Sequence, residues 1–398
     1  MNADFIKQRI YSIDLLRGVV MMIMLLDHTR DFVHADAMRF DPTDVTQTSV
    51  AIFFTRWITH FCAPTFVFLS GVSIYLQRMQ GKTNGELSRF LWTRGLWLIV
   101  LEFTVVRLGM TFNFDYSSFV GVAQVIWVIG VSMIAMAVLI YLPLRIVGLI
   151  GLAMIVLHNL ADGIAVPPEI AFGGTPAPDF WQALWIIVHQ SGLVYGIFFA
   201  YPLIPWIGVM AAGFAFGVIF GWEAEQRRRL LLITGIASTV FFVVLRYINI
   251  YGDLFPWSTQ PNPAFTVLSF LNTTKYPPSL AFLLMTLGPA MIVLFLTDRI
   301  DGNALWQRIC ITFGRVPMFF YILQWFTAHG MGILLAYAAG KTPLLSPPFP
   351  GTEIPPDHGF SLWVVYAAWI VGLILLYPLC LWWGNLKKRN KHWALSYL

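Results

Sequence analysis

Residues 14–28 read Asp14-Leu-Leu-Arg17-Gly-Val-Val-Met-Met-Ile-Met-Leu-Leu-Asp27-His28, an apolar run that carries charge near both ends. Eleven helical steps of about 100° bring Arg17 and His28 to nearly the same side of a helix, about 16 Å apart. An ionisable side chain in the hydrocarbon region costs on the order of 2.5–3.5 kcal/mol, so such groups face a polar interior. The run therefore predicts a membrane-spanning helix with one face on a site, and that face carries Asp14, Arg17, Met21, Met24, His28 and Asp31.

The composition predicts a membrane protein. Hydrophobic residues make up 58% of the 398 residues and charged residues 11%, whereas a soluble domain carries roughly 25% charge. The three cysteines fall in apolar segments without a metal-binding spacing, so we expect buried thiols and neither a disulfide framework nor a metal site. The net charge of +5 comes from basic loop residues in the pattern that a bilayer demands, which argues against nucleic-acid binding.

The apolar runs predict an all-α, polytopic membrane protein with about ten transmembrane helices. Lys7 and Arg9 precede the first run, but no small-residue cleavage site follows, so this run is expected to be retained as a span. Residues 181–201 are expected to form an interfacial or re-entrant helix ahead of the sixth span. The chain is interpreted as one integral-membrane domain over residues 1–398, with spans near 13–30, 52–76, 95–112, 120–141, 143–160, 198–221, 230–251, 279–297, 309–338 and 361–384.

The basic residues of the loops predict the orientation. Sixteen Lys and Arg residues fall in alternate loops that start with the N-terminus, whereas four, Arg30, Arg39, Lys275 and Lys341, fall in the opposite loops. Cytoplasmic loops carry the excess of Lys and Arg, so both termini are expected in the cytoplasm and the protein in the plasma (inner) membrane. The extracytoplasmic loops are long and rich in Pro, Gly and Trp, as expected for an ordered vestibule.

Ionisable side chains gather toward the extracytoplasmic ends of the expected spans, and each has a structural and a functional interpretation. His28 is either a buried structural histidine or a catalytic base or proton carrier, because imidazole titrates near neutral pH. Arg17 with Asp14 is either a helix-end ion pair or a binding site for an anionic cofactor. Arg56 and His60, one helical turn apart, are either packing partners or substrate ligands.

A series of motifs lies in order along nearly the whole chain. They are Tyr11-Ser-Ile-Asp14-Leu-Leu-Arg17-Gly18, Asp27-His28, Pro64-Thr-Phe-Val-Phe-Leu-Ser-Gly71, Tyr201-Pro-Leu-Ile-Pro-Trp-Ile-Gly208, Lys275-Tyr-Pro-Pro-Ser279, Met285-Thr-Leu-Gly-Pro289 and Gly314-Arg-Val-Pro317. In this combination the chain resembles the bacterial relatives of heparan-alpha-glucosaminide N-acetyltransferase. The ten-residue spacing between Arg17 and His28 is similar to that of the wider integral-membrane acyltransferases that modify cell-envelope glycans.

The resemblance implies a transmembrane acyltransferase that moves an acyl group, acetyl in the family, from the cytoplasm to an extracytoplasmic sugar or glycan. Acetyl-CoA or another acyl-CoA is then the co-substrate, and no metal is expected. The implied partners are membrane lipids and the extracytoplasmic saccharide acceptor, with no nucleic acid; a homodimer is compatible with this interpretation.

The resemblance also implies roles for the polar residues. His28 is expected to be the general base, with Asp27 or Asp31 orienting its imidazole. His34 in the following loop competes for that role, and the spacing from Arg17 favours His28. Arg17 and Asp14 are expected at the acyl-CoA, while Arg30, Arg56 and Lys275 would stabilise an oxyanion or bind the acceptor. The full set expected at the acceptor is Arg30, Arg56, His60, Lys275 and Tyr276.

Two other classes of protein fit the same charged face. In a proton-coupled transporter or a flippase of a small or lipid-linked substrate, the face would form a proton relay or substrate path. In a noncatalytic membrane subunit the chemistry would be lost, and Gln324, where relatives would place a histidine, is compatible with that interpretation. Acetyl transfer by the purified protein, against substrate accumulation in vesicles, distinguishes the classes.

Overall fold

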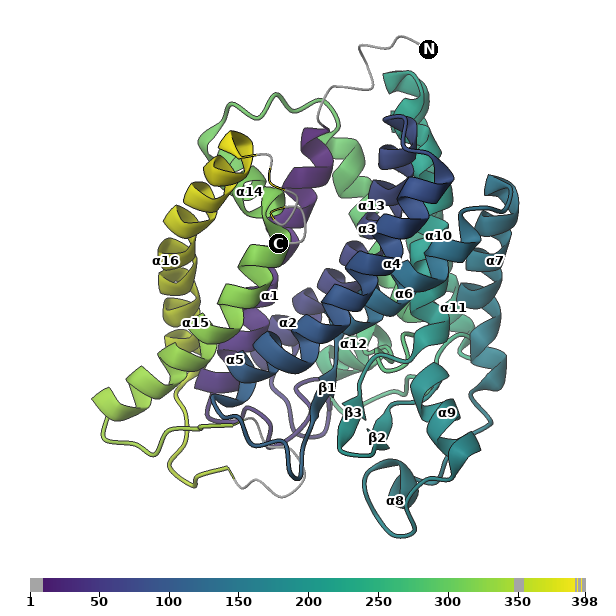
Figure 1. Cartoon of the computed structure of the whole chain (residues 1–398). Helices are drawn as coiled ribbons and strands as arrows, with labels where there is room; N and C mark the ends of the chain where they lie inside the picture. Colours follow the sequence, from purple (N-terminus) through teal and green to yellow (C-terminus); the bar gives the residue numbers. More distant parts are fainter. Residues whose placement is uncertain (1–9, 347–353, 391, 393–394, 396–398) are drawn as a thin grey trace.

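Helices dominate the computed structural model, which describes residues 10–346, 354–390, 392 and 395 (Figure 1). The first part of the chain forms α1 (Tyr11–Val33), α2 (Val50–Trp57), η2 (Ile58–Phe61), α3 (Cys62–Met79), α4 (Asn84–Leu101), the π-helical η3 (Glu102–Val106), α5 (Arg107–Thr111), β1 (Gly121–Ala123), α6 (Val125–Leu139), α7 (Leu144–Leu157) and η4 (His158–Ala161). The rest forms α8 (Pro168–Ala171), α9 (Phe180–Val188), β2 (Gly192–Val194), β3 (Ile197–Phe199), α10 (Leu203–Phe216), η5 (Gly217–Gly221), α11 (Ala224–Ile248), α12 (Pro263–Leu271), α13 (Leu280–Thr297), α14 (Leu305–Arg315), α15 (Pro317–Ala338) and α16 (Leu362–Arg389).

Seven helices among the described residues are long and apolar enough to cross a membrane. The chain is therefore a multi-pass membrane protein. Three more of the expected spans fall on α1, on α4 to α5 and on α6, which do not meet that standard. The first two carry several charges each, and α6 has only 15 residues, fewer than the ~20 of a bilayer crossing. The ten spans and the cytoplasmic termini remain predictions.

Local sequence signals explain several helix ends. Thr83 accepts a hydrogen bond from the N–H of Glu86 at 3.3 Å and the Glu86 carboxylate accepts one from the N–H of Thr83, which starts α4 with a capping box. Asp179 and Gln182 start α9 in the same way. α9 is the short helix expected within 181–201, and it is separate from the spans.

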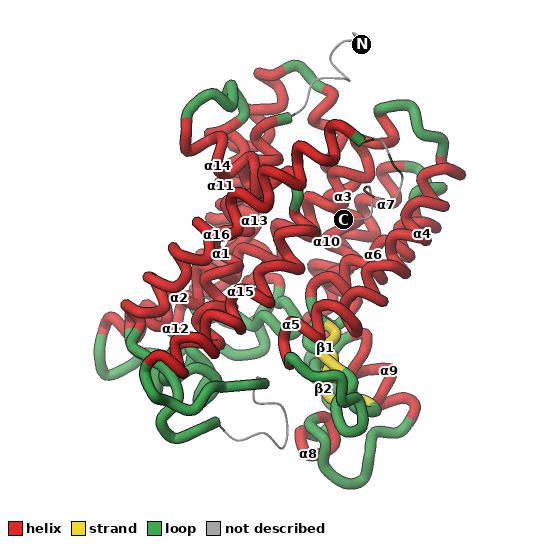
Figure 2. Tube along the Cα trace, turned by 60° about the vertical axis from the view of Figure 1, so that its left-hand side comes forward, coloured by secondary structure: helices red, strands yellow, loops and turns green. Residues whose placement is uncertain are grey.

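The all-α prediction is wrong at one place, because a three-stranded sheet is present. Its strand order is β1-β3-β2, with β1 parallel to β3 and β2 antiparallel to it. In Figures 1 and 2 the sheet lies with α8 and α9 at the lower end of the bundle. The expected spans at 120–141 and 198–221 therefore begin with strands. Their first residues are extended, and β1 at the start of one span pairs with β3 at the start of the other.

The expected span at 309–338 is two helices. The chain turns at Val316, whose φ of −130° and ψ of 49° are not helical, and Pro317 opens α15. Proline is tolerated at a first helical position because its missing N–H is not needed there. The motif Gly314-Arg-Val-Pro317 is therefore a break between helices rather than the interior of one.

α1 packs against α3, α13, α14, α15 and α16, which places its charged residues inside the bundle. Two glycines permit its close approach to α14: a Cβ on Gly18 would collide with the Cys310 carbonyl oxygen, and one on Gly314 with the Asp14 carbonyl oxygen. On the other side of the bundle α10 packs against α3, α6 and α7, and α4 against α6. The site described below lies between these two groups of helices.

Candidate active site

The polar face of α1 borders two cavities. Arg17, Met21 and Met24 line the first, which we call the Arg17 cavity, and Met24, His28 and Asp31 line the second, the His28 cavity. Five of the six residues that the helical periodicity assigns to this face thus border a cavity. Asp14, on the same face, lies outside both linings, 3.8 Å from Arg17 and from Arg315.

The Arg17 cavity has a volume of about 290 Å³. The Arg17 guanidinium donates hydrogen bonds to the Leu69 carbonyl at 3.2 Å and to the Ser73 hydroxyl. Apolar side chains from α4, α6 and α15 make up most of the rest of the wall. The polar side chains of the lining are Arg17, Ser70, Ser73, Gln77, Arg94 and Tyr321.

The His28 cavity is larger, about 590 Å³, and lies toward the loops and the small sheet. Three residues, Met24, Val125 and Tyr321, line both cavities, so the two adjoin. Of the residues predicted at the site, this cavity gathers Asp27, His28, Arg30, Asp31, Arg56, Lys275 and Tyr276.

The carboxylates of the His28 cavity pair with arginines. Asp27 lies 2.9 Å from Arg30 through Oδ1 and 2.5 Å from Arg56 through Oδ2, while Asp31 lies 2.5 Å from Arg30. The Arg56–Asp27 and Arg30–Asp31 pairs are also hydrogen-bonded, and such partly buried pairs hold planar guanidinium groups in a set orientation. Neither carboxylate has a hydrogen bond to His28 among the described side chains, so the expected orientation of the imidazole by Asp27 or Asp31 has no contact to support it.

The imidazole of His28 is buried, with 9% of the residue exposed. Its ring lies over that of Trp325, with centroids 3.7 Å apart. Its Nδ1 has no hydrogen-bond partner within the described part of the chain. Packing against Trp325, rather than a carboxylate, therefore positions this ring in the cavity.

Lys275 and Tyr276 reach the cavity from the loop that precedes α13. Asp253 holds this loop, because it accepts hydrogen bonds from the Thr274 backbone at 3.0 Å and from the Ser279 hydroxyl at 2.7 Å. Burial by itself would raise the pKa of the Tyr276 phenol, but the positive charges of Lys275 and Arg56 outweigh it and hold that pKa below its ordinary value. The loop thus delivers a cation and a phenol of increased acidity to the cavity.

Two histidines considered from the sequence lie outside both cavity linings. His60 is buried, with its ring 5.4 Å from that of Phe282. His34 accepts a hydrogen bond at Nδ1 from the Asp36 N–H at 3.2 Å, and burial lowers its pKa. Within the described structure, the cavity is therefore bordered by His28 and by neither His34 nor His60.

Sequence reasoning missed two aromatic residues of the cavity wall. Tyr321 lines both cavities, and its buried hydroxyl has no hydrogen-bond partner among the described residues. Trp325 follows four residues later on the same face of α15. In an apolar run, two aromatic residues at this spacing look the same in sequence as residues of a hydrophobic core. The only sequence signal of a functional role is the polar hydroxyl of Tyr321 in the middle of an expected span.

Residues 9–248 match the family described as heparan-alpha-glucosaminide N-acetyltransferase, catalytic. The match covers more than half of the 398 residues. The chain belongs to this family. It is accordingly a membrane acetyltransferase, and acetyl-CoA is the acetyl donor of the family. The matched residues include Arg17, His28 and Arg56, whereas the loop of Lys275 and helix α15 follow them. No curated protein sequence matches the chain.

Proposed function

We propose that the protein transfers an acetyl group from acetyl-CoA, bound at the cytoplasmic end, to a hydroxyl or amino group of an extracytoplasmic saccharide. The observation that carries the proposal is the pair of adjoining cavities, one bordered by Arg17 and the other by His28, with Tyr321 in the wall of both. Two cavities that adjoin in this way let a thioester and an acceptor meet although the two substrates enter from opposite ends of the bundle. Membership of an acetyltransferase family favours this function over a transporter or flippase.

The Arg17 cavity receives the CoA end of the donor in this proposal. Arg17 and Arg94 supply two guanidinium groups, which suit phosphate or the polar groups of the pantetheine arm. The largely apolar remainder of the wall suits the slender arm itself. Asp14 acts here only through Arg17, as one of the residues that position it.

The chemical step belongs to the His28 cavity. His28 accepts the proton of the acceptor hydroxyl or amine as that group attacks the thioester carbonyl carbon. The Tyr321 hydroxyl donates a hydrogen bond to the oxygen that becomes negative in the tetrahedral intermediate. The carbon–sulfur bond then breaks, and the CoA thiolate leaves and takes up the proton that His28 holds.

The acceptor meets the cations of the same cavity. Arg30, Arg56 and Lys275 offer donors to sugar oxygens, and Tyr276 adds a phenol beside them. Asp27 and Asp31 hold the two guanidinium groups in place, which is the role we propose for them instead of orienting His28. His60, which packs against Phe282 outside the cavity lining, has no contact with the acceptor in this proposal.

The test uses the purified full-length protein in vesicles with radiolabelled acetyl-CoA on one side and glucosamine-containing saccharides on the other. Label should appear on the saccharide and depend on both substrates. Accumulation of unmodified saccharide inside the vesicles, without label transfer, would instead identify a transporter.

A further inference from the structure

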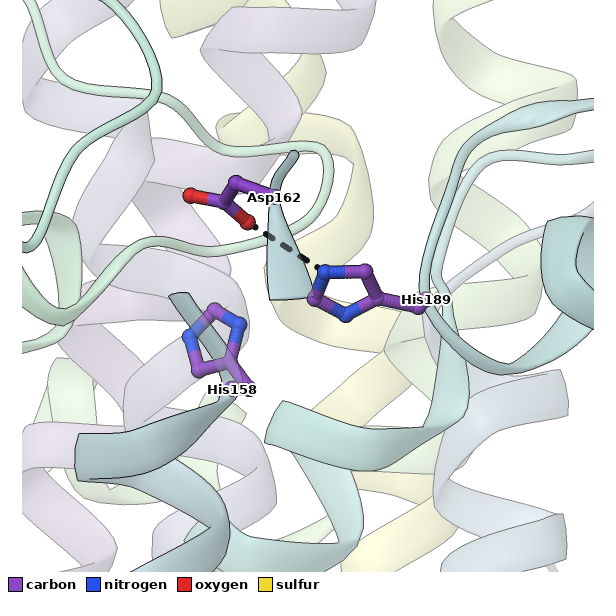
Figure 3. Close-up of side chains that lie close together, drawn as sticks. All are labelled: His158, Asp162 and His189. Atoms are coloured by element: carbon purple, nitrogen blue, oxygen red, sulfur yellow. Dashed lines mark ion pairs between the residues drawn. The ribbon is translucent and has the colours of Figure 1, made fainter. Parts of the chain in front are cut away.

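His158, Asp162 and His189 lie close together (Figure 3), outside both cavity linings, and α9, which His189 follows, lies beside the sheet (Figure 1). His158 opens η4, Asp162 caps its end, and His189 follows α9. One ligand atom from each residue lies within 4.8 Å of the other two, and His189 Nε2 is 3.2 Å from Asp162 Oδ1. The fold thus brings His189 to His158 and Asp162, which are four residues apart, although His189 lies 31 positions after His158 in the sequence.

The two imidazoles lack ordinary partners. His158 is 5% exposed and His189 3%, and apart from the 3.2 Å ion pair of His189 Nε2 with Asp162 Oδ1 their ring nitrogens show no hydrogen bond of good geometry to a described residue. A buried polar atom left unsatisfied costs about 1–3 kcal/mol, so the ring nitrogens outside the His189–Asp162 pair need an explanation. A ligand held between them supplies one.

The surroundings of Asp162 resemble the outer shell of a metal site. Asn159 Nδ2 donates a hydrogen bond to Asp162 Oδ2 at 2.8 Å, so Asp162 Oδ1 is left to face His189. The Oδ1 of Asn159 accepts a hydrogen bond from the Leu280 N–H at 2.9 Å. Trp185 packs its ring 4.8 Å from that of His189. Metal-binding carboxylates are themselves held by hydrogen bonds of this kind.

We propose that His158, Asp162 and His189 bind a divalent transition-metal ion, zinc being the ion that this donor set favours. Two imidazoles and one carboxylate suit zinc, whereas calcium and magnesium take oxygen ligands. Tetrahedral bonds of about 2.0–2.2 Å place ligand atoms about 3.3 Å apart, so binding draws the three side chains inward by rotation. The fourth position is left to water.

Because the cluster lies outside both cavity linings, we assign this ion a role in holding the fold rather than in the transfer reaction. It ties the end of α7 and η4 to the end of α9, and through Asn159 to the first residue of α13. The loop that carries Lys275 and Tyr276 ends at that residue. The ion therefore stabilises the wall of the His28 cavity without contributing to its chemistry, and the inference holds whether or not the proposed transfer reaction is correct.

The experiment measures zinc in the full-length protein purified in detergent through a tag without histidines. Elemental analysis should find about one zinc per chain. Removal with a chelator should lower Tm, and zinc chloride should restore it while magnesium chloride does not. Failure of the wild-type protein to bind zinc would overturn the proposal.

Variants separate this site from adventitious zinc. His158→Ala and His189→Ala should lose the ion, whereas His358→Ala, a buried loop histidine outside the cluster, should keep it. Asn159→Ala removes no zinc ligand but takes away the hydrogen bonds to Asp162 and from the Leu280 N–H, and it should weaken zinc binding about 10–100-fold. If either cluster variant fails to fold, the chelation and re-addition of zinc in the wild-type protein decides. Full zinc retention in folded His158→Ala and His189→Ala would contradict the site.

Discussion

At the scale of single residues, the candidate chemistry depends on side chains that the fold leaves without local partners. His28 Nδ1 and the Tyr321 hydroxyl are both buried and lack a hydrogen bond to the described residues. The charged neighbours, by contrast, are paired: Asp27 with Arg30 and Arg56. Paired charges hold neighbouring side chains in place, whereas a buried base or donor without a protein partner can form a hydrogen bond with a substrate.

His28→Ala should abolish acetyl transfer and leave acetyl-CoA binding intact, because the variant loses the proposed base but none of the Arg17 cavity. Loss of a positioned base lowers kcat by about 10²–10⁴. Transfer kinetics and acetyl-CoA binding by calorimetry check both parts. His34→Ala is the matched control, since His34 lies outside the cavity linings; near wild-type turnover of His28→Ala with loss of activity in His34→Ala would move the base to the loop.

Tyr321→Phe should lower kcat about 10²–10³-fold with little change in the KM for acetyl-CoA, because one donor to the oxyanion is lost. The substitution removes a single oxygen, so the cavity keeps its shape. Tyr377→Phe on α16, whose ring packs 5.8 Å from that of Phe313, is the control and should keep wild-type kcat. An equal effect of the two variants on kcat would rule out the special role of Tyr321.

At the scale of elements, α1 combines packing and function on different faces. Its small residue Gly18 faces Cys310 of α14, whereas Arg17 and His28 border the cavities. Side chains on close-packed helix interfaces have no room for an added methyl group unless the helices move apart. The helix is therefore held in position by the same contacts that aim Arg17 and His28.

Gly18→Ala should destabilise the protein by about 1–3 kcal/mol, because the added Cβ collides with the Cys310 backbone. Thermal unfolding in detergent measures the change as a lower Tm. Gly330→Ala on α15 is the control: nothing lies within 4 Å of its Cβ, and alanine favours a helix over glycine by up to about 1 kcal/mol. A lower Tm for Gly330→Ala than for Gly18→Ala would contradict the packing described here.

Arg17→Ala should weaken acetyl-CoA binding more than it lowers kcat, since Arg17 borders the cavity assigned to the donor. Calorimetric titration with acetyl-CoA gives the affinity, and single-turnover transfer gives the chemical step. Arg145→Ala, at the start of α7, should bind acetyl-CoA like the wild-type protein. Unchanged affinity in a folded Arg17→Ala variant would favour the purely structural pairing of Arg17 with Asp14.

At the scale of the whole molecule, the two ends of the bundle differ in kind. One end carries the small sheet, α8 and α9 (Figure 2), and at the other end the helix ends and the short connections between them carry most of the Arg and Lys residues. Excess positive charge is typical of cytoplasmic loops. The donor and the acceptor would then approach from ends that the bilayer keeps apart.

Lys82→Cys should resist labelling by a membrane-impermeant maleimide added outside intact cells, because its loop is expected in the cytoplasm. The three native cysteines are buried, which keeps the background low. Gln47→Cys, an exposed position in the opposite set of loops, should label readily. Ready labelling at position 82 would reverse the orientation and exchange the ends assigned to donor and acceptor.

The sequence by itself determined the helical, membrane-spanning character of the chain and the face of α1 that carries its polar residues. Both follow from local rules: apolar length for a bilayer crossing, and a turn of about 100° per residue for the shared face. The positions of most helices followed as well. The strands at 121–123 and 197–199 did not, since two short extended segments pair only when the fold brings them together.

Only the tertiary structure decided which side chains meet. It joined Tyr321 and Trp325 of α15 to His28, left His60 outside the cavity, and paired Asp27 with Arg56 instead of with the imidazole. It also brought His189 to His158. Periodicity reports that a face is buried but not what buries it, because the partners come from distant segments and their choice depends on side-chain packing throughout the bundle.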